Sequence, residues 1–137
     1  MAAFRSDPLA KSASRRRVLI IEDEPSIRNV LYVLLAGLGC EGDVASDSRQ
    51  ALSMIRNDTF DAVLLDLVSS HLPPDHMVSA ITQVRPSLVG RVLVITGEVT
   101  DPDTLAMLER CAVPHVVRSR MTTDLWGRLR TMMGFAR

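Results

Sequence analysis

The chain has 137 residues, the length of one ordinary domain, and 47% of them are hydrophobic, which is normal for a globular core. The formal net charge is zero, but residues 1–17 carry five basic side chains and one acidic, so the remaining 120 residues are net −4. A mildly acidic body gives no electrostatic basis for nucleic-acid binding. We expect a flexible basic leader over residues 1–16 and one compact domain over residues 17–137.

The chain has two cysteines, Cys40 and Cys111, and neither has the Cys-x-x-Cys spacing of a metal or redox site. We interpret them as buried thiols in a reducing compartment. Residues 14–17 and the apolar run 18–21 weakly resemble a twin-arginine export signal, but Glu22 ends that run after four residues. A secretory signal needs about 7–15 apolar residues and a membrane span about 20. The sequence therefore predicts a soluble, cytoplasmic protein without a membrane span.

Apolar runs with strand character alternate with amphipathic helical patterns along the body of the chain. The predicted strands cover about residues 17–22, 43–45, 62–66, 91–96 and 114–118. The predicted helices run from Pro25 to a stop at Gly37 and Gly39, and then over about residues 47–57, 75–84, 102–110 and 122–133. Because parallel crossovers are right-handed, this alternation predicts an α/β fold with a doubly wound parallel sheet of order 2-1-3-4-5.

Acidic residues stand where two of these strands end. Glu22 and Asp23 follow the apolar run 18–21, and Asp66 ends the run 62–65. In open α/β sheets, ligands gather outside the carboxyl ends of the strands at the switch point, here between the first and third strands. A divalent cation would relieve the repulsion between these acids. Mg²⁺ fits because it is bound through one or two carboxylates, keeps several waters and bridges to phosphate oxygens.

This arrangement favours phosphoryl chemistry. With its charge neutralised, Asp66 would accept a phosphoryl group as an aspartyl phosphate. Thr96 ends the fourth predicted strand, and its hydroxyl would hydrogen-bond the new phosphoryl oxygens. The alternative is that the acids merely cap the following helices, but capping does not explain why they all converge with Thr96 on one edge of the sheet.

Three segments carry a resemblance to a known family: Ile21-Glu22-Asp23-Glu24-Pro25, Leu64-Leu65-Asp66-Leu67 and Val94-Ile95-Thr96-Gly97. They resemble the receiver domain of bacterial two-component response regulators, and the resemblance covers about residues 17–134. It implies a flavodoxin-like (CheY-like) fold and a signalling domain rather than an enzyme.

The resemblance also implies roles for single residues. Asp23 and Asp66 would bind Mg²⁺ directly, together with the backbone carbonyl of Val68, and Glu22 would act through water. Asp66 would receive the phosphoryl group from a histidine kinase or a histidine phosphotransfer protein. Thr96 would move toward the phosphoryl group on activation.

The predicted site departs from the family at the end of the fifth strand. Receivers carry a lysine followed by proline there, but this chain has Arg118 and Ser119, and its only lysine is Lys11. A planar guanidinium is not a compact ammonium, so the exchange is not conservative. We predict that Arg118 pairs with Asp66 and the phosphoryl group; the alternative is a solvated arginine. Without the proline, the peptide bond before Ser119 is expected to be trans.

The loop after Asp66 departs as well, because Ser70 and Pro74 replace the family's proline and glycine. Proline cannot take a positive φ, so the loop is expected to follow a different path. Val68 flanks the route of an attacking water, and its branched side chain would shield the acyl phosphate, which predicts slow autodephosphorylation. We interpret His71 and His76 as exposed histidines rather than metal ligands or phosphohistidines.

Receivers commonly signal through the face made here by residues 102–110, 114–118 and 122–133. His115 takes the place of the family's aromatic switch residue, or is simply a histidine at the strand edge. Trp126 with Arg128 and Arg130 forms a candidate docking patch, or is a partly buried aromatic. A downstream protein partner would bind this face, and a homodimer is compatible with it.

Three interpretations remain open. The first is a stand-alone receiver phosphorylated on Asp66, without a DNA-binding domain, because only residues 134–137 follow the last predicted helix. The second is a pseudo-receiver that docks constitutively and is never phosphorylated, as Arg118, Ser119 and Pro74 suggest. The third is a small phosphatase, which would need a second aspartate two residues after Asp66, where Val68 stands.

Overall fold

The computed structural model describes residues 15–67, 74–98 and 101–134. Its strands are β1 (Arg16–Ile21), β2 (Cys40–Ala45), β3 (Ala62–Asp66), β4 (Val92–Thr96) and β5 (His115–Val117). Its α-helices are α2 (Pro25–Gly37), α3 (Ser48–Asn57), α4 (Pro74–Val84), α5 (Pro102–Arg110) and α6 (Met121–Met133). Two short 3₁₀ helices are η1 (Pro86–Leu88) and η2 (Arg118–Arg120). Every predicted strand and helix has a counterpart in these residues.

The strands form one parallel sheet of order β2-β1-β3-β4-β5, as predicted. β1 and β3 are neighbours at its centre, with Ile21 opposite Leu65. The chain first steps outward from β1 to β2 and then crosses to β3 on the other side. The switch point therefore lies between β1 and β3, where an open α/β sheet places its ligand.

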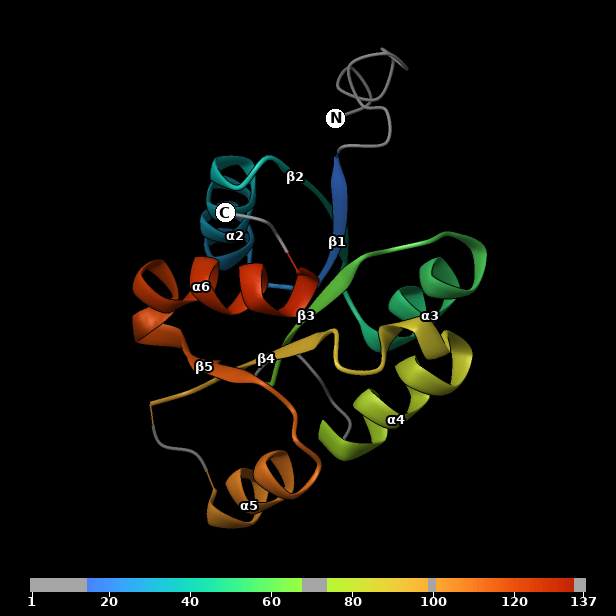
Figure 1. Cartoon of the computed structure of the whole chain (residues 1–137), viewed down its shortest axis with the longest axis vertical. Helices are drawn as coiled ribbons and strands as arrows, with labels where there is room; N and C mark the ends of the chain where they lie inside the picture. Colours follow the sequence, from blue (N-terminus) through green and yellow to red (C-terminus); the bar gives the residue numbers. More distant parts are fainter. Residues whose placement is uncertain (1–14, 68–73, 99–100, 135–137) are drawn as a thin grey trace.

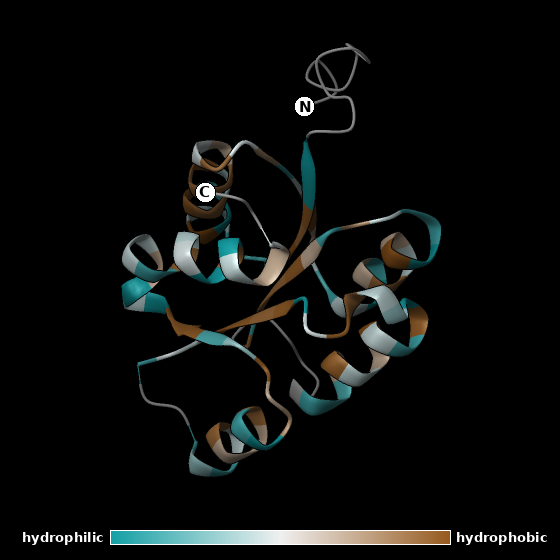
Figure 2. Cartoon of the chain, in the orientation of Figure 1, coloured by the Kyte–Doolittle hydropathy of each residue, from teal (hydrophilic) through white to brown (hydrophobic). Residues whose placement is uncertain are grey.

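Helices cover both faces of the sheet (Figure 1). The buried residues divide into one core between the sheet and α2 and α6, and a second core between the sheet and α3, α4 and α5. Figure 2 shows hydrophobic strands in the middle and helices that alternate between hydrophobic and hydrophilic residues. Every residue of β3 and β4 is buried, as expected for strands covered on both faces.

Side-chain caps fix where two helices begin. Asp47 was expected inside a helix, but it is the N-cap of α3, where its carboxylate accepts a hydrogen bond of 2.8 Å from the Gln50 N–H. In the same way, Asp101 caps α5 by accepting from the Thr104 N–H at 3.0 Å. Asp and Asn side chains accept hydrogen bonds from nearby backbone N–H groups, so they favour the first position of a helix over its interior.

Two strands differ in length from the prediction. β2 begins at Cys40, three residues before the predicted strand, because pairing with β1 extends it to Arg16 opposite Cys40. Gly42, a poor strand former, is covered by Tyr32 and Leu35 of α2. β5 ends at Val117, so Arg118 lies in η2 instead of in the strand.

The two cysteines have different environments. Cys40 is buried, and burial raises the pKa of its thiol, whereas Cys111 is exposed. The expectation of two buried thiols is therefore wrong for Cys111, which follows the last residue of α5. Within the described ranges, no helix is both long enough and apolar enough to cross a membrane.

Candidate functional site

The carboxyl ends of β1, β3 and β4 bring Glu22, Asp66 and Thr96 to one edge of the sheet. Among the described residues, these three are the buried polar or charged ones, with 0%, 1% and 1% of their surface exposed. The Glu22 N–H donates to the carbonyl of Ala45 at 3.0 Å, which continues the pairing of β1 with β2. Buried carboxylates are destabilising unless they are paired, so their position calls for a cation or a function.

Arg118 supplies positive charge to this edge. Its Nη2 donates a hydrogen bond to Oδ2 of Asp66 and lies 3.9 Å from Oε1 of Glu22. Its Nη1 lies 3.6 Å from Oε1 of Glu24. Burial lowers the pKa of Arg118, but the hydrogen bond to Asp66 and the nearby carboxylates raise it, and the net pKa is raised. The predicted pairing of Arg118 with Asp66 is thus present, and the guanidinium stays charged.

The acids do not act as simple helix caps. Glu24 is the N-cap residue of α2, yet its side chain makes no capping hydrogen bond. Instead, its Oε2 accepts from the Ser26 hydroxyl at 2.9 Å, and its backbone N–H donates to Oε2 of Glu22 at 3.1 Å. Asp23 lies between these two acids in the sequence and is exposed. Capping therefore does not explain why Glu22 and Asp66 are buried.

Thr96 and Ser119 complete the edge. The Thr96 hydroxyl donates to the carbonyl of Val116 at 3.4 Å, which places it between β4 and β5. The Ser119 N–H donates to Oε2 of Glu98 at 3.3 Å, so η2 is also tied to the loop after β4. The peptide bond before Ser119 is trans, as expected without the proline.

The carboxylates at this edge suit Mg²⁺ by their chemistry, since it prefers hard oxygen ligands and takes only one or two carboxylates. Asp66, at the end of β3, offers such oxygens, and so does Asp23, which is exposed two residues after the end of β1. In the part of the chain that the structure describes, no group of three or more His, Cys, Asp or Glu side chains is placed to hold a metal ion. Val68, whose carbonyl was predicted as a further ligand, lies outside the described residues.

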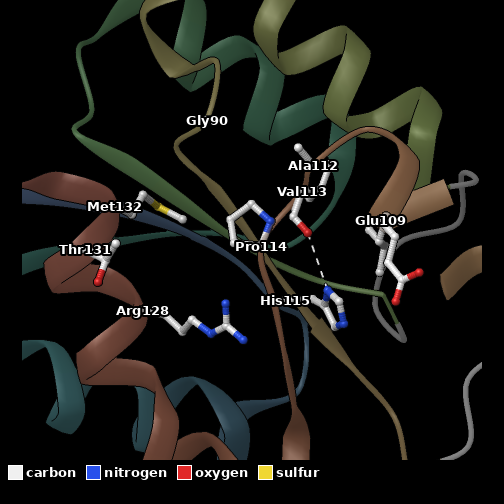
Figure 3. Close-up of a pocket in the computed structure, with 10 residues that line it drawn as sticks. Gly90, Glu109, Ala112, Val113, Pro114, His115, Arg128, Thr131 and Met132 are labelled. Atoms are coloured by element: carbon white, nitrogen blue, oxygen red, sulfur yellow. Dashed lines mark hydrogen bonds between the residues drawn. The ribbon is translucent and has the colours of Figure 1, made fainter. Parts of the chain in front are cut away.

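His115 lies away from the acids, at the start of the edge strand β5. Its Nδ1 is 3.4 Å from the carbonyl of Val113. It lines a hollow of about 570 Å³ between α5 and α6, in which Arg128 and Met132 of α6 face Pro114 (Figure 3). The hollow is near the amino ends of β4 and β5, at the opposite end of the strands from Asp66.

Trp126 does not share a surface with His115. Its Nε1 donates to the carbonyl of Leu34 in α2 at 2.7 Å, and its ring packs against Gly37. The guanidinium of Arg130 lies 5.7 Å from the ring centroid, while Arg128 lines the hollow beside α5. The proposed patch of Trp126, Arg128 and Arg130 is therefore divided between two sides of α6, and Trp126 is 39% exposed although its ring packs on α2.

Sequence reasoning missed Glu24 as a member of the site. Glu24 directly follows Glu22 and Asp23 in the sequence, and Arg118, which replaces the family's lysine, has a forked side chain that can reach a third acid. These two features of the sequence could have predicted that Glu24 belongs to the site.

His76 is exposed in α4, as predicted, whereas Ser70 and His71 lie outside the described residues.

With this fold and this edge of acids in place, comparison with known proteins gives the class. Residues 18–130 match the response regulator receiver domain, so the chain belongs to that family. It is a family of signalling domains rather than of enzymes.

Curated relatives include full-length regulators. The chain is 29% identical over 119 residues to the DNA-binding response regulator MtrA of Mycolicibacterium smegmatis, a match that covers 87% of this chain and 51% of MtrA. It is 26% identical over 117 residues to the response regulator ArlR of Staphylococcus saprophyticus, covering 85% of this chain and 52% of ArlR. The chain thus spans about half the length of the curated relatives it matches.

Solved structures share the fold at low sequence identity. A putative response regulator from Chloroflexus aurantiacus has a TM-score of 0.76 and 17% identity, with 88% of this chain and 99% of that chain covered. The receiver domain of the sensor histidine kinase PA1611 from Pseudomonas aeruginosa has a TM-score of 0.71 and 19% identity, with 88% and 98% covered. The latter was solved with a magnesium ion coordinated in its active-site cleft.

Proposed function

We propose that this receiver accepts a phosphoryl group on Asp66 from a histidine kinase or a histidine phosphotransfer protein. The observation that carries the proposal is a carboxylate, 1% exposed, at the carboxyl end of the central strand β3 and paired with a cation. Burying such a group does not stabilise a fold by itself, so a chemical role is the better account.

In the proposed step, an oxygen of the Asp66 carboxylate attacks the phosphorus of a phosphohistidine. The N–P bond breaks, its electron pair goes to the imidazole, and the imidazole takes up a proton from water. The acyl phosphate that forms carries negative charge on oxygens near Arg118 and the Thr96 hydroxyl. Both groups are hydrogen-bond donors, and both would stabilise those oxygens.

Mg²⁺ would be held by Asp23, Asp66 and the backbone carbonyl of Val68, with Glu22 acting through water. When bound, it supplies positive charge that offsets the repulsion between carboxylates and phosphoryl oxygens. The carboxylate oxygens of Asp23 and Asp66 and the magnesium ion in the PA1611 receiver support this assignment.

A small phosphodonor tests the proposal without knowledge of the kinase. Incubation with acetyl phosphate and Mg²⁺ is expected to add one phosphoryl group to the intact protein, as read by mass spectrometry. Asp66→Asn should abolish the addition, whereas Asp103→Asn, the same change at an exposed position in α5, should leave it unchanged. Phosphorylation that persists in Asp66→Asn would overturn Asp66 as the acceptor.

One observation favours the pseudo-receiver as a second candidate. Arg118 contacts three carboxylates at once and offsets part of their charge without a phosphoryl group. A chain that works this way would gain no mass from acetyl phosphate or from a beryllofluoride mimic. It would also keep its function in a strain that carries Asp66→Ala.

The signal is proposed to pass to a protein partner in the cytoplasm that binds α5, β5 and α6, where His115 borders the hollow.

Slow autodephosphorylation also stays a prediction, because Val68 lies outside the described residues. The acyl phosphate of Val68→Asn should hydrolyse faster than that of the unaltered chain, and an unchanged half-life would count against shielding.

A further inference from the structure

We propose that Arg118 is an internal counter-ion that competes with Mg²⁺ for the acidic edge, so that the metal binds only as the guanidinium leaves Asp66. The inference rests on the proposed function, because it concerns the same site. It goes further by making Mg²⁺ occupancy depend on a residue of this chain that is neither a metal ligand nor the phosphoryl acceptor.

Geometry is the first support. The Arg118 guanidinium donates to Asp66 Oδ2 and forms ion pairs with Glu22 and Glu24, at 3.9 and 3.6 Å. Asp66 is also a proposed ligand of the metal. A guanidinium and a divalent cation beside the same carboxylate would repel each other strongly, since both are positive and the local dielectric is low. If both were bound to Asp66, the guanidinium and Mg²⁺ would each weaken the binding of the other.

The shape of the arginine side chain is the second support. Its two terminal nitrogens point at different acids, Nη2 at Asp66 and Glu22, and Nη1 at Glu24. A lysine has one compact charge and cannot span these carboxylates in the same way. A guanidinium is also permanently charged, so it does not leave the edge by losing a proton. Arginine is therefore the stronger competitor at this position.

Burial is the third support. The Asp66 and Glu22 side chains are each 1% exposed, and the Arg118 side chain is 27% exposed. Water therefore screens these pairs less than it screens a surface ion pair. By contrast, Arg120 in the same 3₁₀ helix is 61% exposed and pairs with Asp124 on the surface. The two arginines differ in their partners and in their burial, which makes Arg120 a matched control.

The test measures Mg²⁺ affinity directly by isothermal titration calorimetry with MgCl₂, independently of phosphorylation. Arg118→Gln is expected to bind Mg²⁺ at least about tenfold more tightly than the unaltered chain, because a partly buried positive charge beside Asp66 is removed. Arg118→Lys should bind at least about threefold more tightly, since the fork is lost but the charge is kept. Arg120→Gln should match the unaltered chain within about twofold.

A purely structural role for Arg118 predicts the opposite, because a loosened site binds metal less well. Unchanged or weaker Mg²⁺ affinity in Arg118→Gln would overturn the inference. Circular dichroism establishes that each variant is folded. If Arg118→Gln does not fold, the Mg²⁺ affinity of Arg118→Lys, compared with that of the unaltered chain, tests the inference instead. Equal affinity in that comparison would also overturn it.

A second measurement follows the guanidinium itself. Arg118 Nε is buried and has no hydrogen-bond partner among the described residues, so its N–H should give a distinct NMR signal. Addition of MgCl₂ should shift this signal in the unaltered chain and not in Asp23→Asn; no shift at metal saturation would overturn the inference.

The outcomes separate this inference from the proposed function. If every variant binds Mg²⁺ equally, competition is excluded while phosphorylation of Asp66 stands. If neither the unaltered chain nor any variant binds Mg²⁺, both the inference and the metal part of the proposed function are overturned. Phosphate uptake on Asp66 is read separately, by mass.

Discussion

Ala112 has a backbone conformation that favours glycine. Its φ is 55°, in the left-handed region where an L side chain is strained. The Ala112 N–H donates to the carbonyl of Glu109 at 3.1 Å, and the Val113 N–H donates to that of Leu108 at 2.8 Å. These two hydrogen bonds form a Schellman motif, which ends α5 and usually has glycine where Ala112 stands.

Replacing Ala112 with glycine should therefore stabilise the protein. We expect Ala112→Gly to raise the free energy of unfolding by roughly 0.5–1 kcal/mol in urea denaturation, because relief of strain exceeds the added chain entropy. The matched control is Ala106→Gly, at an exposed position within α5, which should lower it by about 0.5–1 kcal/mol. A loss of stability in both variants would contradict the strain at Ala112.

At the scale of elements, one aromatic side chain joins α6 to α2. The hydrogen bond from Trp126 to Leu34 reaches a carbonyl in the last turn of α2, where an α-helix has no residue four positions further on to donate to it. The indole ring covers Gly37, the last residue of α2, so closely that a Cβ there would lie 2.5 Å from Cζ2 of Trp126. The absence of a side chain at Gly37 thus permits the helices to meet.

Gly37→Ala should displace the indole ring. We expect the free energy of unfolding to fall by about 1–3 kcal/mol through overpacking, with a change in the fluorescence of the only tryptophan. Gly127→Ala is the control, because an added Cβ in that helix meets nothing within 4 Å. It should raise stability by up to about 1 kcal/mol. Equal gains from both changes would show that the helices do not meet through Trp126.

At the scale of the whole molecule, the sheet joins the two cores. Adjacent residues of β3 face opposite sides: Leu64 packs with α2 and α6, and Leu65 packs with α3, α4 and α5. Both side chains are fully buried. Because β3 belongs to both cores, a substitution that destabilises one core should destabilise the other as well.

Leu65→Ala tests whether the molecule unfolds as one unit. It should lower the free energy of unfolding by roughly 2–5 kcal/mol through the cavity that it leaves. Trp126 fluorescence reports the opposite side of the sheet, yet its unfolding midpoint should fall together with that measured by circular dichroism. Leu64→Ala serves as the reference on the side of Trp126. A fluorescence midpoint that does not respond to Leu65→Ala would show two independent units.

Much of this architecture could be predicted from local patterns and topology. Continuous apolar runs predicted β3 and β4, and the alternation of strands and helices predicted the strand order. The position of Asp66 at a strand end then predicted its approach to Glu22 and Thr96, because parallel strands end at the same edge. β2 was predicted too short, because its length depends on pairing with β1 rather than on its own polar sequence.

The sequence by itself determined the sheet and the acidic edge, since hydrophobic periodicity and the direction of parallel strands are properties of the chain order. Only the tertiary structure decided which side chains meet there. Arg118 reaches Glu24, 94 positions earlier in the chain, and Trp126 turns toward α2 rather than toward His115. Such contacts depend on distances and rotamers between distant segments, which no local pattern encodes.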